Sequence, residues 1–240
     1  MTSVMVWNAR GLGVRDKSAY IFNESRRLKV SILAILEPKQ SVVHINFFTK
    51  CLGFCHSLYN SLCSHAIWVF WNQDAEVEHV EASTQHITTK VKFDCSETFL
   101  SFVYASNEVA VRKDLWPSLG EFSLGDSSWV ISGDFNTIAD IREKRGGSGY
   151  LREVMQDFQL FMVHNGISDM GFSSSHFTWC NNGKGNRRIW SRLDHCLLNV
   201  QSLDAFPQST VLHLPRALSD HSPLVLVLQS DARGLERFIY

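Results

Sequence analysis

Side chains that could hold a metal ion or move a proton stand at the ends of apolar segments in this sequence. The segment Val4–Trp7 ends at Asn8, and the segment Ile32–Leu36 ends at Glu37, where Pro38 stops the strand from continuing. Oxygen atoms of such side chains are the ligands that Mg²⁺ requires, and this ion takes only one or two carboxylates while it keeps several waters. Asn8 and Glu37 therefore predict part of a metal site.

A second group of such residues lies further along the chain. One apolar segment ends in a Gly-Asp-Phe-Asn turn that carries Asp134 and Asn136, whose side chains project to the same side because they are two residues apart. Asp194 and the pair Asp220 and His221 each stand beside a further apolar segment. A histidine with a carboxylate partner can activate or hold the water that metal-assisted phosphodiester hydrolysis needs. Together these positions predict such a hydrolytic site.

The elements that must position these side chains are mostly strands. Strands are predicted over Val4–Asn8, Ser31–Leu36, Ala66–Asn72, Val77–Ala82, His86–Phe93, Thr98–Tyr104, Trp129–Ser132, Arg192–Asn199, Thr210–Leu214 and Leu224–Leu228. Helical periodicity predicts helices over Lys17–Lys29, Val109–Leu119 and Leu151–Asn165. This order favours an α/β fold with two packed mixed β-sheets flanked by helices over alternating βαβ units.

Composition indicates one globular domain. Of the 240 residues 45% are hydrophobic, which excludes a disordered chain, and no apolar run approaches the roughly 20 residues that cross a bilayer. No linker interrupts the chain, so we expect one domain over residues 1–230 and a tail over 231–240. The net charge of -1 neither favours nor excludes nucleic acid as a partner.

The N-terminal residues read as a strand and not as a signal peptide, so we expect an intracellular protein, nuclear or cytoplasmic. Its six cysteines are then expected to be thiols. Cys51, Cys55, His56, Cys63 and His65 crowd one segment, but without the paired spacing of a zinc site we expect no zinc there.

The order of the motifs carries a resemblance to a known family. The motifs are Trp7-Asn8-x-Arg10-Gly11, Glu37, Tyr104, Gly133-Asp134-Phe135-Asn136, Arg192-Leu193-Asp194-His195 and Ser219-Asp220-His221-Ser222-Pro223. In this order they resemble the endonuclease/exonuclease/phosphatase superfamily, which includes deoxyribonuclease I and the apurinic endonucleases. Residues 8–13, 143–147, 177–179 and 191–195 look more narrowly like the endonuclease domain of plant LINE-type (non-LTR) retrotransposons. The resemblance spans nearly the whole chain and implies a four-layer α/β sandwich with the active site at one rim.

The resemblance also implies a metal site. Glu37 matches the main metal ligand of the superfamily, Asn8 matches the amide beside it, and Asp220 matches an acid that can help to hold the ion. The implied cofactor is Mg²⁺, or Mn²⁺ in its place. Many relatives carry an aspartate where this chain has Arg10, a residue that cannot bind Mg²⁺.

The remaining catalytic roles follow from the same resemblance. Asp134 and Asn136 match the pair that orients the attacking water and contacts the phosphate. His221 matches the histidine that contacts the scissile phosphate and assists water activation. Asp194 matches the carboxylate that hydrogen-bonds this histidine, and Tyr104 matches the tyrosine near the transition-state phosphate.

Two basic loops are the predicted DNA contacts. The loops carry Lys184, Arg187, Arg188 and Arg192 in one case and Arg142, Lys144 and Arg145 in the other. Cations of this kind pair with phosphates, and neighbouring aromatic side chains can wedge at a groove. Trp179 and Trp190 fit such a role and core packing equally well.

The predicted function is a Mg²⁺-dependent endonuclease that nicks DNA and leaves a 3′ hydroxyl. We expect a monomer that acts on DNA, with no membrane partner and no reverse transcriptase domain in this chain. Two alternatives stay open: an apurinic repair nuclease or phosphatase of the same superfamily, and a catalytically silent retroelement remnant. Ser64-His65-Ala66 favours the remnant, because relatives have a Ser-Gly-Gly turn at this place and losing two glycines can strain it.

Overall fold

The computed structural model describes residues 2–13, 15–62, 66–93, 96–121, 127–147 and 152–230. The predicted tail at 231–240 and the residues Ser64 and His65 of the altered turn lie outside this part of the chain. Within it, no helix is long and apolar enough to cross a membrane.

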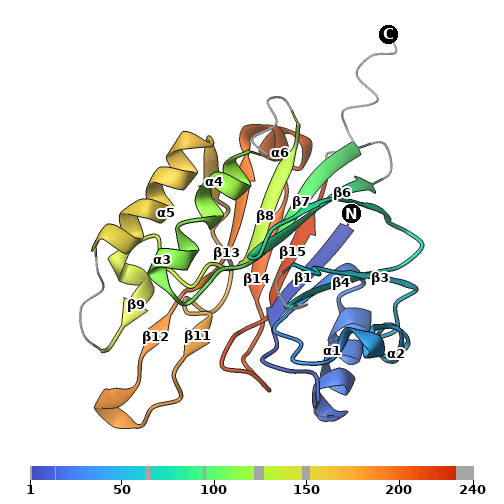
Figure 1. The fold of residues 1–240 in the computed structure, drawn as a ribbon, viewed down its shortest axis with the longest axis horizontal. Coiled ribbons are helices and arrows are strands. Elements are labelled where there is room, and N and C mark those ends of the chain that lie inside the picture. The colour runs from blue at the N-terminus through green and yellow to red at the C-terminus, as the bar shows by residue number, and fades with distance from the viewer. Residues whose placement is uncertain are drawn as a thin grey trace.

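Two six-stranded mixed β-sheets form the centre of the protein (Figure 1). In spatial order the first sheet contains β14 (Thr210–His213), β15 (Leu224–Leu228), β1 (Thr2–Asn8), β2 (Val30–Leu36), β4 (Ile67–Trp71) and β3 (His56–Tyr59). The second contains β10 (Ile167–Asp169), β13 (Asp194–Asn199), β8 (Trp129–Asp134), β7 (Ser96–Tyr104), β6 (His86–Phe93) and β5 (Glu76–Ala82). A small third sheet contains β11 (Trp179–Cys180), β12 (Trp190–Ser191) and β9 (Lys144–Arg145).

Helices cover the outer faces of the two large sheets, on opposite sides of the molecule in Figure 1. The first sheet carries α1 (Arg15–Arg27) and α2 (Ile45–Cys51), the latter after the short η1 (Val42–His44). The second carries α3 (Val109–Arg112), α4 (Leu115–Gly120) and α5 (Arg152–His164). The remaining short helices are η2 (Ile141–Glu143), η3 (Gly185–Arg187) and α6 (Val200–Ala205). These four layers confirm the predicted α/β sandwich.

Burial explains why the central strands read as continuous apolar runs. Both faces of β2 are covered, so all seven of its residues are buried. Ile32 faces the core between the sheets together with Val4 and Phe102, whereas Leu33 packs with Trp68 under the helices. Alternating side chains of one strand therefore fill two different cores.

One helix differs from its prediction. The segment expected to form a single helix over Val109–Leu119 is divided into α3 and α4 by a break at Lys113 and Asp114. Pro117 explains this break, since it lacks the N–H that would bond the carbonyl of Lys113 and its ring would clash with that carbonyl. In the first turn of the separate α4, the same proline is tolerated.

The strand pairing brings the predicted site residues to one rim. The parallel pair β1 and β2 ends with Asn8 opposite Leu36, and the parallel pair β7 and β8 ends with Tyr104 opposite Asp134. Antiparallel β13 begins at the same edge, because Asp194 lies opposite Asp134. Polar residues at these strand ends must therefore meet.

We predict that Gly133→Ala destabilises the protein by more than about 3 kcal/mol, because its added methyl group cannot be accommodated. Gly133 has a φ of 149°, and a Cβ there would overlap the backbone carbonyl of Val103 on β7. Gly166→Ala is the control, since its φ is also positive but nothing lies within 4 Å of the added Cβ, and we expect a cost of about 1 kcal/mol. Urea unfolding measures both, and equal costs would contradict the packing argument.

Candidate active site

A single amide joins the ends of the two large sheets. The Nδ2 atom of Asn8, on the first sheet, donates to Glu37 Oε1 at 3.2 Å and to Asp134 Oδ2 of the second sheet at 2.9 Å. Asn8 and Asp134 are fully or almost fully buried. The two carboxylates that the sequence placed on separate strands thus lie on either side of one side chain.

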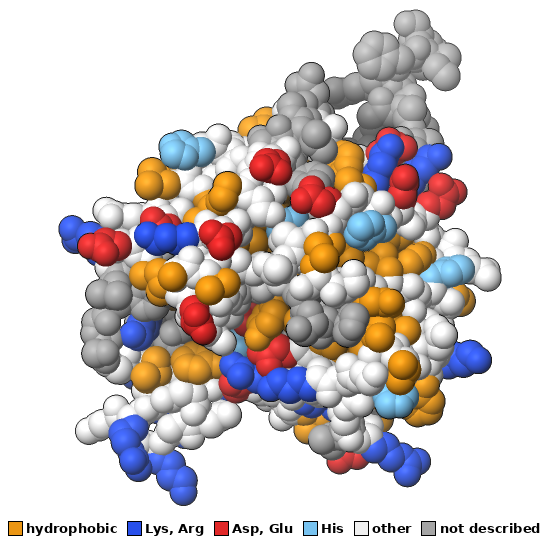
Figure 2. Space-filling view, viewed as in Figure 1, with side chains coloured by type: hydrophobic (Ala, Val, Ile, Leu, Met, Phe, Trp, Pro, Cys, Tyr) orange, Lys and Arg blue, Asp and Glu red, His pale blue; other side chains and the backbone are white. Residues whose placement is uncertain are grey.

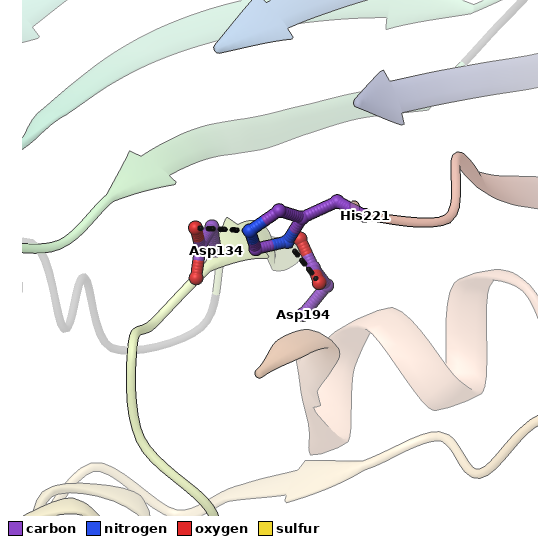
Figure 3. Close-up of side chains that lie close together, drawn as sticks. All are labelled: Asp134, Asp194 and His221. Atoms are coloured by element: carbon purple, nitrogen blue, oxygen red, sulfur yellow. Dashed lines mark hydrogen bonds and ion pairs between the residues drawn. The ribbon is translucent and has the colours of Figure 1, made fainter. Parts of the chain in front are cut away.

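His221 lies between two aspartates (Figure 3). Its Nδ1 is 2.9 Å from Asp194 Oδ2 and its Nε2 is 3.6 Å from Asp134 Oδ2, and all three residues are buried. Burial by itself lowers the pKa of His221, but the charges of Asp194 and Asp134 outweigh it and raise this pKa to about 9. The imidazole is therefore a cation at neutral pH.

The buried Nε2 of His221 has no hydrogen-bond partner in the described part of the chain. A buried polar atom of this kind is costly unless a ligand or water satisfies it. Ligand atoms of His221, Asp134 and Asp194 all lie within 4.8 Å of one another. The cluster thus has the composition and spacing to bind a further charged group.

Asp134 is held in place by its own turn. The backbone N–H of Asn136 donates to Asp134 Oδ1 at 2.9 Å, and the Asn136 side chain donates to the carbonyl of Ala105 at 2.6 Å. Burial raises the pKa of the Asp134 carboxyl, and His221 opposes that increase. Asn136 has a φ of 48°, in the left-handed region that asparagine tolerates better than most residues.

Glu37 is surrounded by hydrogen-bond donors and cations. Tyr104 donates its hydroxyl to Glu37 Oε1 at 2.7 Å, and Lys39 Nζ lies 3.0 Å from Glu37 Oε2. Burial alone would raise the pKa of Glu37, but these contacts, Arg10 and Asn8 together lower it. Glu37 is therefore an ionised carboxylate that attracts positive charge.

Asp220 lies at the edge of the same site. Arg10 Nε is 3.1 Å from Asp220 Oδ1 and 3.8 Å from Glu37 Oε1, so one guanidinium bridges two of the predicted metal ligands. The other oxygen of Asp220 accepts a hydrogen bond from the indole N–H of Trp179 at 3.0 Å. This hydrogen bond gives Trp179 a role at the site that its sequence position did not reveal.

The donor set fits a hard divalent cation. Ionised Glu37 and the nearby Asp220, which Arg10 bridges, supply the one or two carboxylates that Mg²⁺ or Mn²⁺ takes, and the Asn8 side chain beside Glu37 carries an amide oxygen. The cations Arg10 and Lys39 show that this position attracts positive charge. The identity of the metal stays a prediction.

Comparison with known structures agrees with this architecture. No protein-family model matches the chain, and no curated protein matches its sequence. The endonuclease domain of TRAS1, a telomere-specific non-LTR retrotransposon, is similar to it with a TM-score of 0.72 and 14% identity, over 96% of this chain and 100% of that one.

Two further structures of this kind are an AP endonuclease and a phosphatase. The AP endonuclease LMAP from Leishmania major gives a TM-score of 0.75 and 14% identity, over 95% of this chain and 87% of that one. The 3′ phosphatase NExo from Neisseria, bound to a product DNA hairpin, gives a TM-score of 0.69 and 17% identity, over 95% of this chain and 100% of that one. This chain has the deoxyribonuclease I-like fold.

Most of the predicted DNA-contacting cations lie on the outside of this deoxyribonuclease I-like fold. Arg142 and Arg145 are exposed on η2 and β9, and Lys144 is half-buried between them. Lys184, Arg187 and Arg188 are exposed on the hairpin that joins β11 and β12. Cationic side chains extend at the lower left of Figure 2, where Figure 1 shows this hairpin.

The prediction that Arg192 contacts DNA is wrong. Its side chain is only 6% exposed, and its guanidinium donates to Glu143 Oε1 and to Asp169 Oδ1, each at 2.7 Å. Asp169 also contacts His195 Nδ1 at 3.1 Å. Arg192 therefore joins η2 and β10 inside the deoxyribonuclease I-like fold, next to Asp194, and is not available to DNA.

We predict that Arg192→Met destabilises the protein by about 3–5 kcal/mol, because the change leaves the buried Glu143 and the half-buried Asp169 without their cation. Arg187→Met is the matched control, since Arg187 is exposed, and we expect a change within about 0.5 kcal/mol. Equilibrium urea unfolding gives both values. Similar small changes in the two variants would show that Arg192 is not part of a buried network.

Proposed function

We propose that this chain is a Mg²⁺- or Mn²⁺-dependent endonuclease that hydrolyses DNA phosphodiester bonds and nicks one strand. The observation that carries the proposal is the buried contact of His221 with Asp134 and Asp194, connected through Asn8 to ionised Glu37. A histidine cation, ionised carboxylates and an unsatisfied N–H donor together suit a negatively charged ester attacked by water.

His221 serves as the donor to the phosphate. Because Asp194 and Asp134 keep the imidazole protonated at neutral pH, its Nε2–H can donate to a non-bridging phosphate oxygen as negative charge develops there. Asp194 fixes the ring through Nδ1. His221 is thus the group that stabilises the transition state and holds its proton.

Asp134 serves as the acceptor for the water proton. Its raised pKa makes it a better base than an ordinary aspartate, and Asn136 holds it in position through the backbone N–H. The water oxygen bonds to phosphorus, the bond to the 3′ oxygen breaks, and that oxygen takes a proton from solvent. The products are a 3′ hydroxyl and a 5′ phosphate.

Glu37, with Asn8 and Asp220, would hold the metal ion, which would supply a Lewis acid for the phosphate when bound. Tyr104 keeps its proton, because burial and Glu37 raise its pKa, and it holds the Glu37 carboxylate in place. The predicted contact of Tyr104 with the transition-state phosphate belongs to the same proposal.

The substrate and origin rest on narrower support. The motifs at residues 8–13 and 191–195 and the similarity to the TRAS1 domain support a non-LTR retrotransposon origin. The similarity to an AP endonuclease and to a 3′ phosphatase supports the alternative substrates, abasic DNA and phosphate monoesters. A silent remnant is the third alternative, and the site residues described above argue against it because their contacts are intact.

We expect supercoiled plasmid to be nicked in the presence of Mg²⁺ and to stay intact in EDTA. Glu37→Gln and His221→Ala should each lower the nicking rate by about 10²–10⁴-fold, because one removes the metal carboxylate and the other the phosphate donor. Glu24→Gln is the control, since Glu24 pairs with Arg27 on the surface of α1 and should leave the rate unchanged.

The same assay separates the alternatives. Faster cleavage of abasic DNA or of small phosphate monoesters than of plasmid would favour the repair nuclease or phosphatase. A folded wild-type protein that cleaves none of these substrates would contradict the proposed function and favour the remnant.

For the basic hairpin, we expect the double variant Arg187→Ala and Arg188→Ala to bind duplex DNA about tenfold more weakly. The slope of log affinity against log salt should also fall by up to about two, one for each lost phosphate contact. Lys90→Ala with Lys92→Ala is the matched control. Both lysines lie on β6 and pair with Phe99 and Glu97 of β7, away from the end of β7 that carries Tyr104. Equal affinity and slope in wild type and the hairpin variant would remove the hairpin from the DNA interface.

A further inference from the structure

A polar pocket of about 550 Å³ adjoins the candidate active site. Its lining is formed by Arg10, Lys17, Asn182, Arg216, Ala217, Leu218, Ser219 and Asp220. Arg10 belongs to both places, because its Nε lies 3.1 Å from Asp220 and 3.8 Å from Glu37. A ligand in this pocket would therefore lie directly beside the group attacked at the active site.

The pocket carries an excess of positive charge. Three cationic side chains line it against one acid, Asp220, whose oxygens already contact Arg10 and the indole of Trp179. Lys17 adds its charge from inside the protein, where its ammonium donates to the carbonyl of Ala9. The lining thus favours an anion.

The guanidinium of Arg216 is positioned to bind such an anion. Its guanidinium lies 4.4 Å from the ring centroid of Trp190 on β12, and no acidic side chain of the described residues forms an ion pair with it. A guanidinium stacked on an aromatic ring keeps its N–H donors in a fixed plane, and that fork matches two oxygens of a phosphate. The stacking also gives Trp190 a function besides packing.

We propose that this pocket binds a backbone phosphate of the DNA strand that flanks the scissile phosphate, with Arg216 and Arg10 as its ligands. The proposal rests on the nuclease function above and names the part of the substrate that the site recognises beyond the reacting bond. The pocket is larger than one phosphate and leaves room for the attached sugar. Arg10 then holds the strand in register between the pocket and Glu37.

The test is equilibrium binding of short duplex DNA to the full chain in EDTA, so that no cleavage occurs. Arg216→Ala should weaken binding about tenfold and reduce the salt slope by about one. Arg216→Lys keeps the charge but loses the planar fork, so the salt slope should recover while the affinity recovers only in part. Lys92→Ala, towards the far end of β6, is the control with unchanged affinity.

Neutral methylphosphonates placed one at a time along the strand locate the phosphate. At one position beside the cleavage site, the methylphosphonate should weaken DNA binding by the wild type. It should not weaken binding by Arg216→Ala any further, because that variant has already lost the arginine that pairs with this phosphate. Additive losses at every position, or wild-type affinity in the Arg216→Ala variant, would overturn the proposal.

The two proposals fail in different ways. If wild type nicks DNA but Arg216→Ala binds as wild type does, the pocket proposal alone is wrong. If wild type binds DNA with the predicted pairing but never nicks it, the nuclease function is wrong and the subsite stands. If wild type binds no DNA, both are wrong.

Discussion

The contact of His221 with Asp134 and Asp194 is the interaction on which the rest of the site depends. Three buried ionisable groups are costly unless they neutralise one another, so the cluster requires β8, β13 and the segment before β15 to keep their relative positions. The backbone of His221 extends this constraint, because its carbonyl accepts the indole N–H of Trp7 and it bridges to Trp179. Each large sheet and the small third sheet are thereby connected to His221, the second large sheet through its ring and the other two sheets through its backbone.

This arrangement explains how a nearly neutral chain could bind the polyanion that we propose as its substrate. The net charge is -1, but four acids, Glu37, Asp134, Asp194 and Asp220, meet at the rim of the sandwich, where Arg10 and Lys39 already compensate Glu37. Other cations gather on the β11–β12 hairpin and around Arg216. The local placement of charge, and not its sum, therefore supports the proposed DNA binding, which should depend strongly on salt.

The sequence predicted the strand ends well because burial leaves a clear pattern. A strand covered on both faces is a continuous apolar run, so the first polar residue after it, such as Glu37, marks the rim. Arg192 could not be placed in this way, because its partners Glu143 and Asp169 are 49 and 23 residues away along the chain. The same holds for Arg216, whose stacking on Trp190 joins segments that no local pattern connects.

The charge state of His221 tests the account most directly. NMR of the ¹⁵N-labelled imidazole, followed against pH in EDTA, reports the protonation of both ring nitrogens. We predict that both carry protons at pH 7, with a midpoint near a pKa of about 9 that falls in Asp194→Asn. A midpoint at or below about 6.5, the ordinary value for histidine, would contradict the claim that two aspartates hold an imidazolium at this site.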